Sequence, residues 1–170
     1  MKLPVRFLLT TVVATAAMAA CSSNKPKTTP PPVTDTTAVT STTTGGKYTV
    51  ESLDTDACLR QRVIYFDLDK TDIHSEFQAA IACHAAYLRQ FPGARVTLEG
   101  NCDERGTREY NLGLGERRGN SVQGALGGAG ASTSQLNVVS YGEERPVCKD
   151  HSEDCWQKNR RVEIVYTSKQ

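Results

Sequence analysis

The chain has 170 residues, a length that favours one folded domain over two. Its composition is that of an ordinary globular protein, which excludes collagen-like and coiled-coil architectures. The formal net charge is +1, and loss of Lys2 and Arg6 with the leader described next leaves 18 basic against 19 acidic residues, or −1. A near-neutral chain lacks the basic surface that nucleic acid requires, so we expect no nucleic-acid partner.

The first twenty residues have the pattern of a secretory signal peptide. Lys2 and Arg6 supply a charged start. An apolar run follows over 7–20, and its length of about 14 residues is too short to cross a bilayer. We therefore predict a signal peptide over 1–20, and hence an oxidising compartment outside the cytosol.

The leader ends in Met18-Ala19-Ala20-Cys21. This resembles the bacterial lipoprotein processing box, in which small residues precede a cysteine that is acylated and becomes the new N-terminus. The resemblance implies lipidation of Cys21; the alternative is ordinary cleavage after Ala20, which leaves Cys21 free. In that pattern an Asp after the cysteine favours retention in the inner membrane, so Ser22 implies the periplasmic face of the outer membrane.

Residues 21–47 are predicted to form a tether. They are rich in Thr, Ser and Pro, include Pro30-Pro31-Pro32, and show no apolar periodicity. Such a stretch buries too little apolar surface to offset its ordering entropy, so we expect it to be disordered. As a flexible coil it would span roughly 25–30 Å on average, which gives an anchored domain reach.

Residues 48–170 are predicted to form the folded domain. Its start holds only weak signals, a strand over 48–50 and a helical turn near Cys58. The β-branched and aromatic run over 63–66 predicts a strand. Apolar residues at helical spacing over 77–91, ended by Pro-Gly, predict the first long helix.

Further elements follow at regular spacing. Alternation over 94–100 predicts a half-buried strand, and the pattern over 110–126 predicts a second helix. A third strand is expected over 136–141, a short helix over 154–159 and a last strand over 162–167. This βαβαβ(α)β order predicts an α+β, two-layer fold in which helices pack on one face of a small mixed sheet.

The segment 100–118 carries the clearest chemical signal. A strand delivers Asp103 into a Gly-containing loop, and that loop opens a helix with Arg118 about two turns in. A carboxylate and a guanidinium that flank one cleft suit a zwitterion, because the acid accepts from an ammonium and the Arg fork binds a carboxylate in bidentate fashion. Geometry alone leaves an alternative open, in which Asp103 and Arg118 pair with each other.

Several stretches resemble the OmpA C-terminal-like family of peptidoglycan-binding domains, and within it the lipid-anchored Pal family. The resemblance covers about 60–167 and implies the two-layer fold of that family. The stretches that carry it are Val63-Ile64-Tyr65-Phe66-Asp67-Leu68-Asp69-Lys70, Asp103-Glu104-Arg105-Gly106-Thr107, Tyr110-Asn111, Leu114-Gly115-Glu116-Arg117-Arg118, Val139-Ser140-Tyr141-Gly142 and Asn159-Arg160-Arg161.

The resemblance implies noncovalent binding of the diaminopimelate in the peptidoglycan stem peptide. Asp103 would take the ammonium and Arg118 the carboxylate. Further residues would line the same pocket: Asp67, Asn101, Cys102, Gly106, Thr107, Asn111 and Leu114. Two positions depart from the family pattern, with Asn101 in place of His and Cys102 in place of Thr or Ala.

The resemblance also implies a place in the cell envelope. The lipid anchor would insert in the outer membrane, and the domain would bind the cell wall. Pal family members also bind Tol proteins, through a surface that overlaps the cleft. We therefore expect partners in the Tol system and a role in envelope constriction at cell division. No cofactor is expected.

Six cysteines remain to be placed, five of them after Cys21. Cys148 and Cys155 bracket a short polar loop and favour a disulfide. A metal site with His151 has ligand-like spacing but lacks a fourth ligand, so we expect no metal. Among the other three we expect Cys58 to pair with Cys83, which leaves Cys102 as a free thiol.

Two other function classes were weighed against a binding module. A peptidoglycan hydrolase needs two placed carboxylates, a metal, or a nucleophile with a base, and only Cys102 with His84 suggests such a pair. A protein-binding scaffold that never touches the wall is the other. The sequence favours the binding module and predicts no enzymatic activity.

Overall fold

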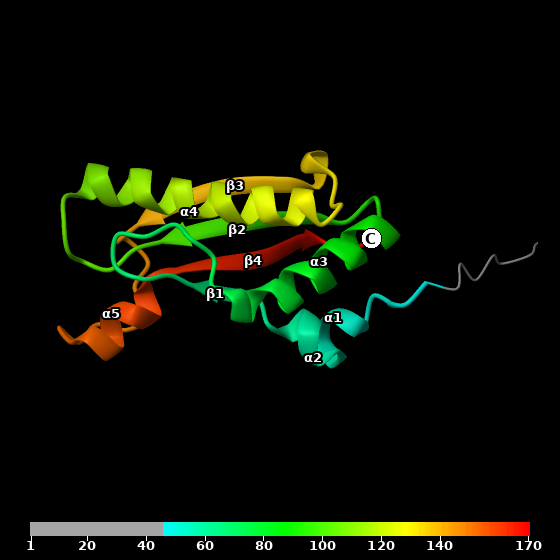
Figure 1. The fold of residues 1–170 in the computed structure, drawn as a ribbon, viewed down its shortest axis with the longest axis horizontal. Helices are drawn as coiled ribbons and strands as arrows, with labels where there is room; N and C mark the ends of the chain where they lie inside the picture. The colour runs from blue at the N-terminus through cyan, green and yellow to red at the C-terminus, as the bar shows by residue number, and fades with distance from the viewer. Residues whose placement is uncertain (1–45) are drawn as a thin grey trace, which may run out of the picture. The chain divides into compact units, whose positions relative to one another are not determined.

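A computed structural model describes residues 46–170 of the chain (Figure 1). The predicted signal peptide over 1–20, the lipidation site Cys21 and the predicted tether up to residue 45 lie outside the described residues. None of the helices within 46–170 has both the length and the apolar character that crossing a membrane requires.

Four strands form one mixed sheet in the order β1-β4-β2-β3. β4 runs antiparallel to β1 and β2, whereas β2 and β3 are parallel. The predicted α+β class with a small mixed sheet is therefore confirmed. The strands are β1 (Val63–Tyr65), β2 (Arg95–Asn101), β3 (Leu136–Gly142) and β4 (Arg161–Ser168).

Two long helices, α3 (Gln78–Gln90) and α4 (Arg108–Gly128), cover the sheet (Figure 1). α4 approaches β2 so closely that a Cβ on Gly100 would collide with the backbone carbonyl oxygen of Gly115. α3 reaches β4, where His84 is hydrogen-bonded to the Tyr166 hydroxyl at 2.9 Å. Five shorter helices complete the domain: α1 (Ser52–Thr55), α2 (Ala57–Arg60), η1 (Ser75–Phe77), η2 (Thr133–Gln135) and α5 (Glu153–Asn159).

The core lies between the sheet and these two helices. Alternate residues of the central strands are fully buried, as a sheet with one covered face requires. The aromatic ring of Tyr87 packs against Phe91 and Tyr166, with centroids 4.6 and 5.4 Å apart. The apolar strand residues that are almost completely buried are Ile64, Val96, Leu98, Val162 and Ile164.

Two predicted elements differ from the structure. The strand expected over 48–50 is absent, because the backbone N–H and carbonyl of Tyr48 bond to the side chain of Gln90 and not to a neighbouring strand. The second long helix extends beyond 110–126 at both ends. Thr107 caps its start by accepting from the backbone N–H of Tyr110 at 3.2 Å, and Gly130 follows its end at φ +97°.

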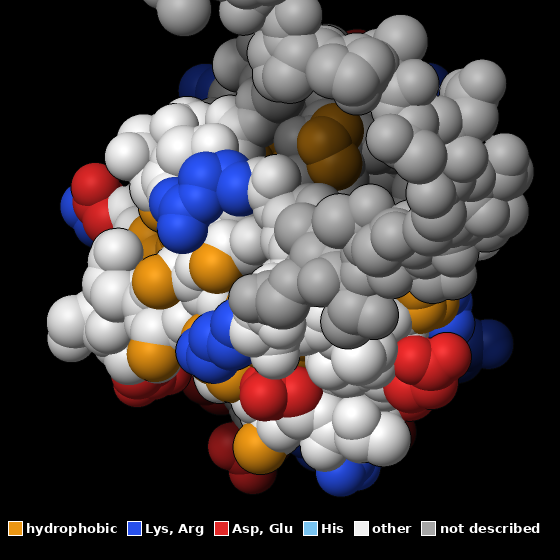
Figure 2. All heavy atoms as spheres, turned by 90° about the vertical axis from the view of Figure 1, so that its right-hand side faces the viewer, with side chains coloured by type: hydrophobic (Ala, Val, Ile, Leu, Met, Phe, Trp, Pro, Cys, Tyr) orange, Lys and Arg blue, Asp and Glu red, His pale blue; other side chains and the backbone are white. Residues whose placement is uncertain are grey.

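The face of the domain in Figure 2 carries basic and acidic side chains interspersed, with apolar side chains between them. Ion pairs at the surface join opposite charges, as between Asp54 and both Arg62 (3.1 Å) and Lys169 (3.2 Å). Exposed pairs of this kind contribute little stability. Among the described residues that Figure 2 shows, charges of both signs are mixed on this face.

Two disulfides are present among the described residues. Cys58 of α2 is bonded to Cys83 of α3, and Cys148 is bonded to Cys155 of α5. The structure thus makes both pairs that the sequence favoured. Cys102 is a buried free thiol.

Replacing Cys83 with Ser is expected to lower the free energy of unfolding by about 3 kcal/mol, since the Cys58–Cys83 bond closes a separation of 25 residues. Removing Cys148–Cys155, which closes a separation of 7, should cost less, about 2 kcal/mol. Urea denaturation of the oxidised variants measures both losses. Equal losses, or no loss for Cys83→Ser, would contradict this loop-entropy account.

Candidate functional site

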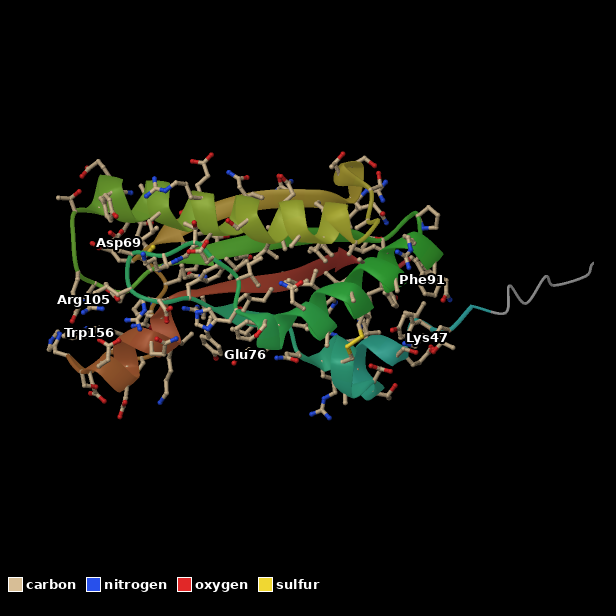
Figure 3. The ribbon with its side chains drawn as sticks, viewed as in Figure 1. Lys47, Asp69, Glu76, Phe91, Arg105 and Trp156 are labelled. Carbon is tan, nitrogen blue, oxygen red and sulfur yellow. A yellow bond between two sulfur atoms is a disulfide. The ribbon has the colours of Figure 1, made fainter. Side chains whose placement is uncertain are left out.

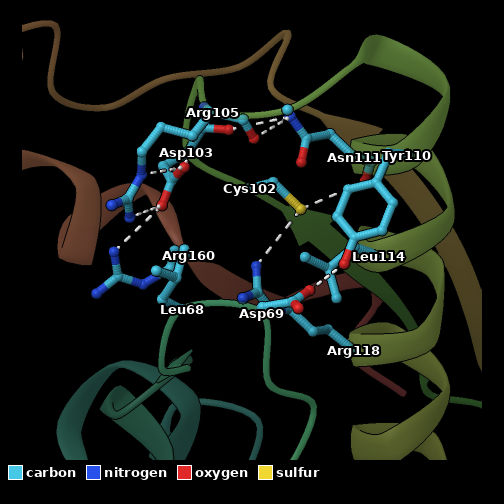
Figure 4. A pocket seen from close by; sticks show the side chains of 11 residues that line it. Leu68, Asp69, Cys102, Asp103, Arg105, Tyr110, Asn111, Leu114, Arg118 and Arg160 are labelled. Carbon is cyan, nitrogen blue, oxygen red and sulfur yellow. Dashed lines mark hydrogen bonds and ion pairs between the residues drawn. The ribbon is translucent and has the colours of Figure 1, made fainter.

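A pocket of about 360 Å³ opens where β2 ends and α4 begins (Figure 4). Its lining combines two carboxylates and three guanidinium groups with apolar side chains, so the formal charge of the lining is +1. It is lined by Leu68, Asp69, Cys102, Asp103, Arg105, Gly106, Tyr110, Asn111, Leu114, Arg118 and Arg160.

Two loops build the walls of this pocket. The first joins β2 to α4 and turns at Gly106, whose φ of +109° lies in the region that favours glycine. The second follows β1 and contains Asp69, the only non-glycine residue at positive φ in the described chain (+58°). The Tyr110 hydroxyl on α4 bonds to the Asp69 carboxylate, which joins the two walls at the rim.

Arg118 lies at the bottom of the pocket with its side chain completely buried. Its Nε donates to the carbonyl of Lys70 (2.9 Å), and its Nη2 to that of Asp67 (2.9 Å). Its Nη1 donates to the carbonyl of Asn101 (3.1 Å) and to the Cys102 sulfur (3.4 Å). These bonds use four of the five donors of a guanidinium and leave one N–H on Nη2.

No carboxylate of residues 46–170 forms an ion pair with Arg118. Its direct contacts are with neutral acceptors and with the face of the Phe66 ring, 5.3 Å away, and the Asp103 carboxylate acts on it only through space. Burial lowers the pKa of the Arg118 guanidinium, although an arginine stays protonated in proteins. A buried cation without an anion is costly, so the pocket is suited to an anionic group.

Asp103 lies in the same pocket, and its side chain is 4% exposed. Arg105 holds it from its backbone N–H (3.1 Å), Nε (3.1 Å) and Nη2 (2.7 Å), and Arg160 donates from Nη1 at 3.2 Å. Burial alone would raise the pKa of this carboxyl, but the hydrogen bonds from the two arginines outweigh it and lower the pKa.

Asp103 and Arg118 are therefore held apart and do not pair with each other, which resolves the alternative that geometry left open. The expected bidentate use of the Arg118 fork is not available while backbone carbonyls hold it. What Arg118 offers a ligand is its full charge and one N–H.

Cys102 separates this pocket from a second cavity of about 260 Å³. Its thiol donates to the carbonyl of Asn111 at 3.3 Å. Burial raises the pKa of the Cys102 thiol to about 11, despite the neighbouring Arg118. The sulfur is thus a neutral, buried part of the wall at neutral pH.

The structure brings together most of the residues proposed from the sequence. Six of the nine line the pocket: Cys102, Asp103, Gly106, Asn111, Leu114 and Arg118. Asn111 helps shape the loop, because its Nδ2 donates to the carbonyl of Arg105 at 3.1 Å.

Three proposed residues do not line the pocket. The Asp67 carboxylate faces outward to His74 at 3.1 Å, and only its carbonyl serves the site, through Arg118. The Asn101 side chain is buried and donates to the carbonyl of Glu99 at 3.0 Å. Thr107 caps α4. These three family positions therefore support the backbone and side chains around the pocket and do not form its surface.

The pocket also contains residues that the sequence did not single out. Arg105 and Arg160 both hold Asp103, and their signal lay in the two motifs that contain them, Asp103-Glu104-Arg105-Gly106 and Asn159-Arg160-Arg161. The rim residues Leu68, Asp69 and Tyr110 also lie in stretches that carry the family resemblance, but no role in the site was predicted for them.

The proposed metal alternative at the Cys148–Cys155 loop finds no support in the geometry. Both sulfurs are used in the disulfide, although the Asp150 carboxylate lies close to them. His151 faces away from them, with its Nδ1 2.5 Å from Glu104. This contact raises the pKa of the His151 imidazole through hydrogen bonding to the carboxylate.

Known proteins resemble this chain over its described part. The model of the OmpA family matches residues 65–160. A protein of Haemophilus influenzae named peptidoglycan-associated lipoprotein is 46% identical over 121 residues, which cover 71% of this chain and 76% of the relative. Its namesake in Pseudomonas putida is 51% identical over 114 residues, 66% of this chain and 68% of the relative.

Solved structures agree with this result. The crystal structure of the peptidoglycan-associated lipoprotein from Burkholderia pseudomallei matches with a TM-score of 0.67 and 40% identity, over 68% of this chain and 98% of that one. The C-terminal domain of Helicobacter pylori MotB matches with a TM-score of 0.57 over 62% of this chain and 84% of that one, but at 23% identity it shows the fold alone. This chain belongs to the OmpA family, and within it resembles the peptidoglycan-associated lipoproteins.

Proposed function

We propose that the chain binds peptidoglycan noncovalently through the diaminopimelate of the stem peptide. The side-chain end of diaminopimelate is a zwitterion, with an ammonium and a carboxylate on one carbon. In the proposed complex the ammonium approaches Asp103 and the carboxylate approaches Arg118. The names of the relatives, peptidoglycan-associated lipoprotein, support peptidoglycan as the partner.

The observation that carries this proposal is the buried, unpaired charge of Arg118. Burying such a charge costs several kcal/mol of stability. Its presence is therefore best explained by a function that requires it. A carboxylate from a ligand would supply the missing anion and accept the remaining N–H of Nη2. The pocket, at about 360 Å³, has the size of a small-molecule site, and Leu68, Tyr110 and Leu114 give it apolar walls for a methylene chain.

We further propose that the molecule links the outer membrane to the cell wall. Lipidation at Cys21 would anchor one end, and the tether would give the domain its reach. Figure 3 supports this arrangement, because Lys47, the last residue of the proposed tether, lies at the opposite end of the domain from Asp69 and Arg105. Partnership with Tol proteins and a role in cell division complete the proposal, on the resemblance to the Pal family.

A binding role without catalysis is part of the same proposal. The hydrolase alternative needs a nucleophile beside a base. Cys102 is a poor nucleophile at neutral pH, since burial raises its pKa to about 11. His84 lies on α3 and bonds to Tyr166 and to the carbonyl of Gln61 (3.2 Å), so it is occupied elsewhere.

Sedimentation with purified peptidoglycan tests the proposal. Wild-type protein should sediment with sacculi that contain diaminopimelate and remain in solution with cell walls that carry lysine at that position, because lysine lacks the second carboxylate that Arg118 would bind. Equal sedimentation with both walls, or with neither, would contradict the assignment. Release of soluble muropeptides that Cys102→Ala abolishes would support the hydrolase instead.

A further inference from the structure

The carboxylate of Asp103 has no free acceptor position in this structure. A carboxylate offers about four lone-pair sites. Oδ1 accepts from the backbone N–H and Nε of Arg105, and Oδ2 accepts from Nη2 of Arg105 and Nη1 of Arg160 (Figure 4). An ammonium that binds Asp103 must therefore replace one of these donors.

The two arginines differ in how firmly they are held. Arg160 is 3% exposed, and it also donates to the carbonyl of Phe66 (3.0 Å) and to Glu153 (2.7 Å). The side chain of Arg105 is 32% exposed and lies along the pocket wall. Release of Arg105 leaves less surface unpacked, so Arg105 is the donor that a ligand can replace.

Arg105 has a second set of partners on α5. Its Nη1 lies 3.6 Å from the Glu153 carboxylate, and its guanidinium carbon lies 4.2 Å from the centre of the Trp156 ring. Trp156 is itself held by its Nε1, which donates to Glu104 at 2.8 Å. An Arg105 side chain that leaves Asp103 therefore still has an anion and an aromatic face within reach.

We propose that Arg105 is an exchangeable partner of Asp103, which a ligand's ammonium replaces while Arg105 stays on Glu153 and Trp156. This inference rests on the proposed function. After the exchange Oδ1 keeps the backbone N–H of Arg105 and Oδ2 keeps Arg160, so one position on each oxygen becomes free for the ammonium. Arg105 would thereby select for cationic ligands, because a ligand without a cation cannot replace the Arg105 guanidinium on the Asp103 carboxylate.

The variant Arg105→Met tests the exchange, since it keeps the length of the side chain and removes the competing charge. The probe is a soluble stem peptide that ends in meso-diaminopimelate, titrated by calorimetry. Loss of the competitor should tighten binding about twofold to fivefold, the range expected for a partly exposed ion pair. Arg108→Met is the matched control and should bind as wild type does, because Arg108 is an exposed arginine at the start of α4 that pairs with Glu144 and does not line the pocket.

Fluorescence supplies a readout that a merely structural role would not move, because Trp156 is the only tryptophan of the chain. Ligand should change the emission of Trp156 in wild type, because the Arg105 guanidinium over the indole ring would lose Asp103 and keep only Glu153 as an anionic partner. The change should disappear in Arg105→Met although the peptide still binds. The same peptide with its side-chain amine acetylated should bind both proteins weakly and without an emission change.

The outcomes separate this inference from the proposed function. Binding by Arg105→Met that is equal to or weaker than that of wild type would overturn the exchange and leave diaminopimelate recognition intact. An emission change that persists in Arg105→Met would also overturn the exchange. Failure of wild type to bind the unmodified peptide would overturn both.

Discussion

Replacing Arg118 with Met is expected to weaken binding of a diaminopimelate stem peptide by about 100-fold. The expected loss corresponds to removal of one member of a desolvated charge pair, about 3 kcal/mol. Met fills a similar length, so the pocket keeps its walls but loses its only cation without an anionic partner among the described residues. Isothermal titration calorimetry of the folded variant measures the effect.

The same substitution should lower stability by a smaller amount. The carbonyls of Asp67, Lys70 and Asn101 lose their donor from Arg118, at about 1 kcal/mol each. Relief from burying a charge offsets part of this, so we expect a net loss of about 2 kcal/mol in the free energy of unfolding. Arg118→Lys should fall between wild type and Met, since one ammonium keeps the charge but cannot reach all three carbonyls.

Arg117→Met is the matched control for this prediction. Arg117 is the next residue on α4, is exposed, and does not line the pocket. Its loss removes the same formal charge, so affinity should stay within about twofold of wild type, as expected for a screened surface charge. If Arg118→Met and Arg117→Met bind equally well, the buried charge of Arg118 has no role in recognition.

Sequence patterns located the central pair of the site because strand, loop and helix are local in the chain. Asp103 lies near the start of the loop that joins β2 to α4, and Arg118 lies on the buried face of α4, so adjoining elements bridge their 15-residue separation. Hydrophobic periodicity predicts both elements. Periodicity left open whether the two side chains pair with each other, and the resemblance to the OmpA C-terminal-like family implied the shared pocket.

The partners of Asp103 could not be read in the same way. Arg160 follows it by 57 residues and reaches it only because α5 leads into β4 beside β2. Arg105 is a neighbour in sequence, but whether its side chain turns to Asp103 or to solvent depends on Trp156 and Glu153 of α5. Such long-range packing leaves no periodic signal in a single sequence.

At some positions the residue type suggested a role that differs from the one in the structure. Asp67 has a carboxylate suited to a ligand, yet the site uses its carbonyl, which any residue supplies. Thr107 has a hydroxyl suited to a ligand, yet the start of α4 requires that hydroxyl as a cap. Tyr48 suggested a strand, but its ring is buried for packing and its backbone pairs with a side chain.

Replacing Asp103 with Asn is expected to abolish recognition of the ammonium and to destabilise the domain. Without the carboxylate, Arg105 and Arg160 share the pocket with Arg118 and keep only the exposed Glu153 as an anionic partner. Breaking a buried pair from one side costs about 3 kcal/mol or more, because the 3% exposed Arg160 keeps its charge. Affinity for the stem peptide should fall about 100-fold, by calorimetry.

The stability loss in Asp103→Asn should depend on pH. The pKa of Asp103 is lowered in the folded chain, so its stabilising contribution is fully present above the unfolded value of about 3.9. That contribution is lost as the pH falls through the lower folded value. The difference in unfolding free energy between wild type and Asp103→Asn should therefore be constant from pH 7 to about 5 and should shrink below about pH 4.

Urea denaturation at several pH values measures this difference, with Asp72→Asn as the control. Asp72 is exposed and lies outside the pocket, so its variant should follow the wild-type curve at every pH. A stability difference for Asp103→Asn that stays unchanged down to pH 3 would mean that the carboxylate does not carry the effect. The loss would then come from altered packing, because an amide in place of the carboxylate also misplaces the donors of Arg105 and Arg160.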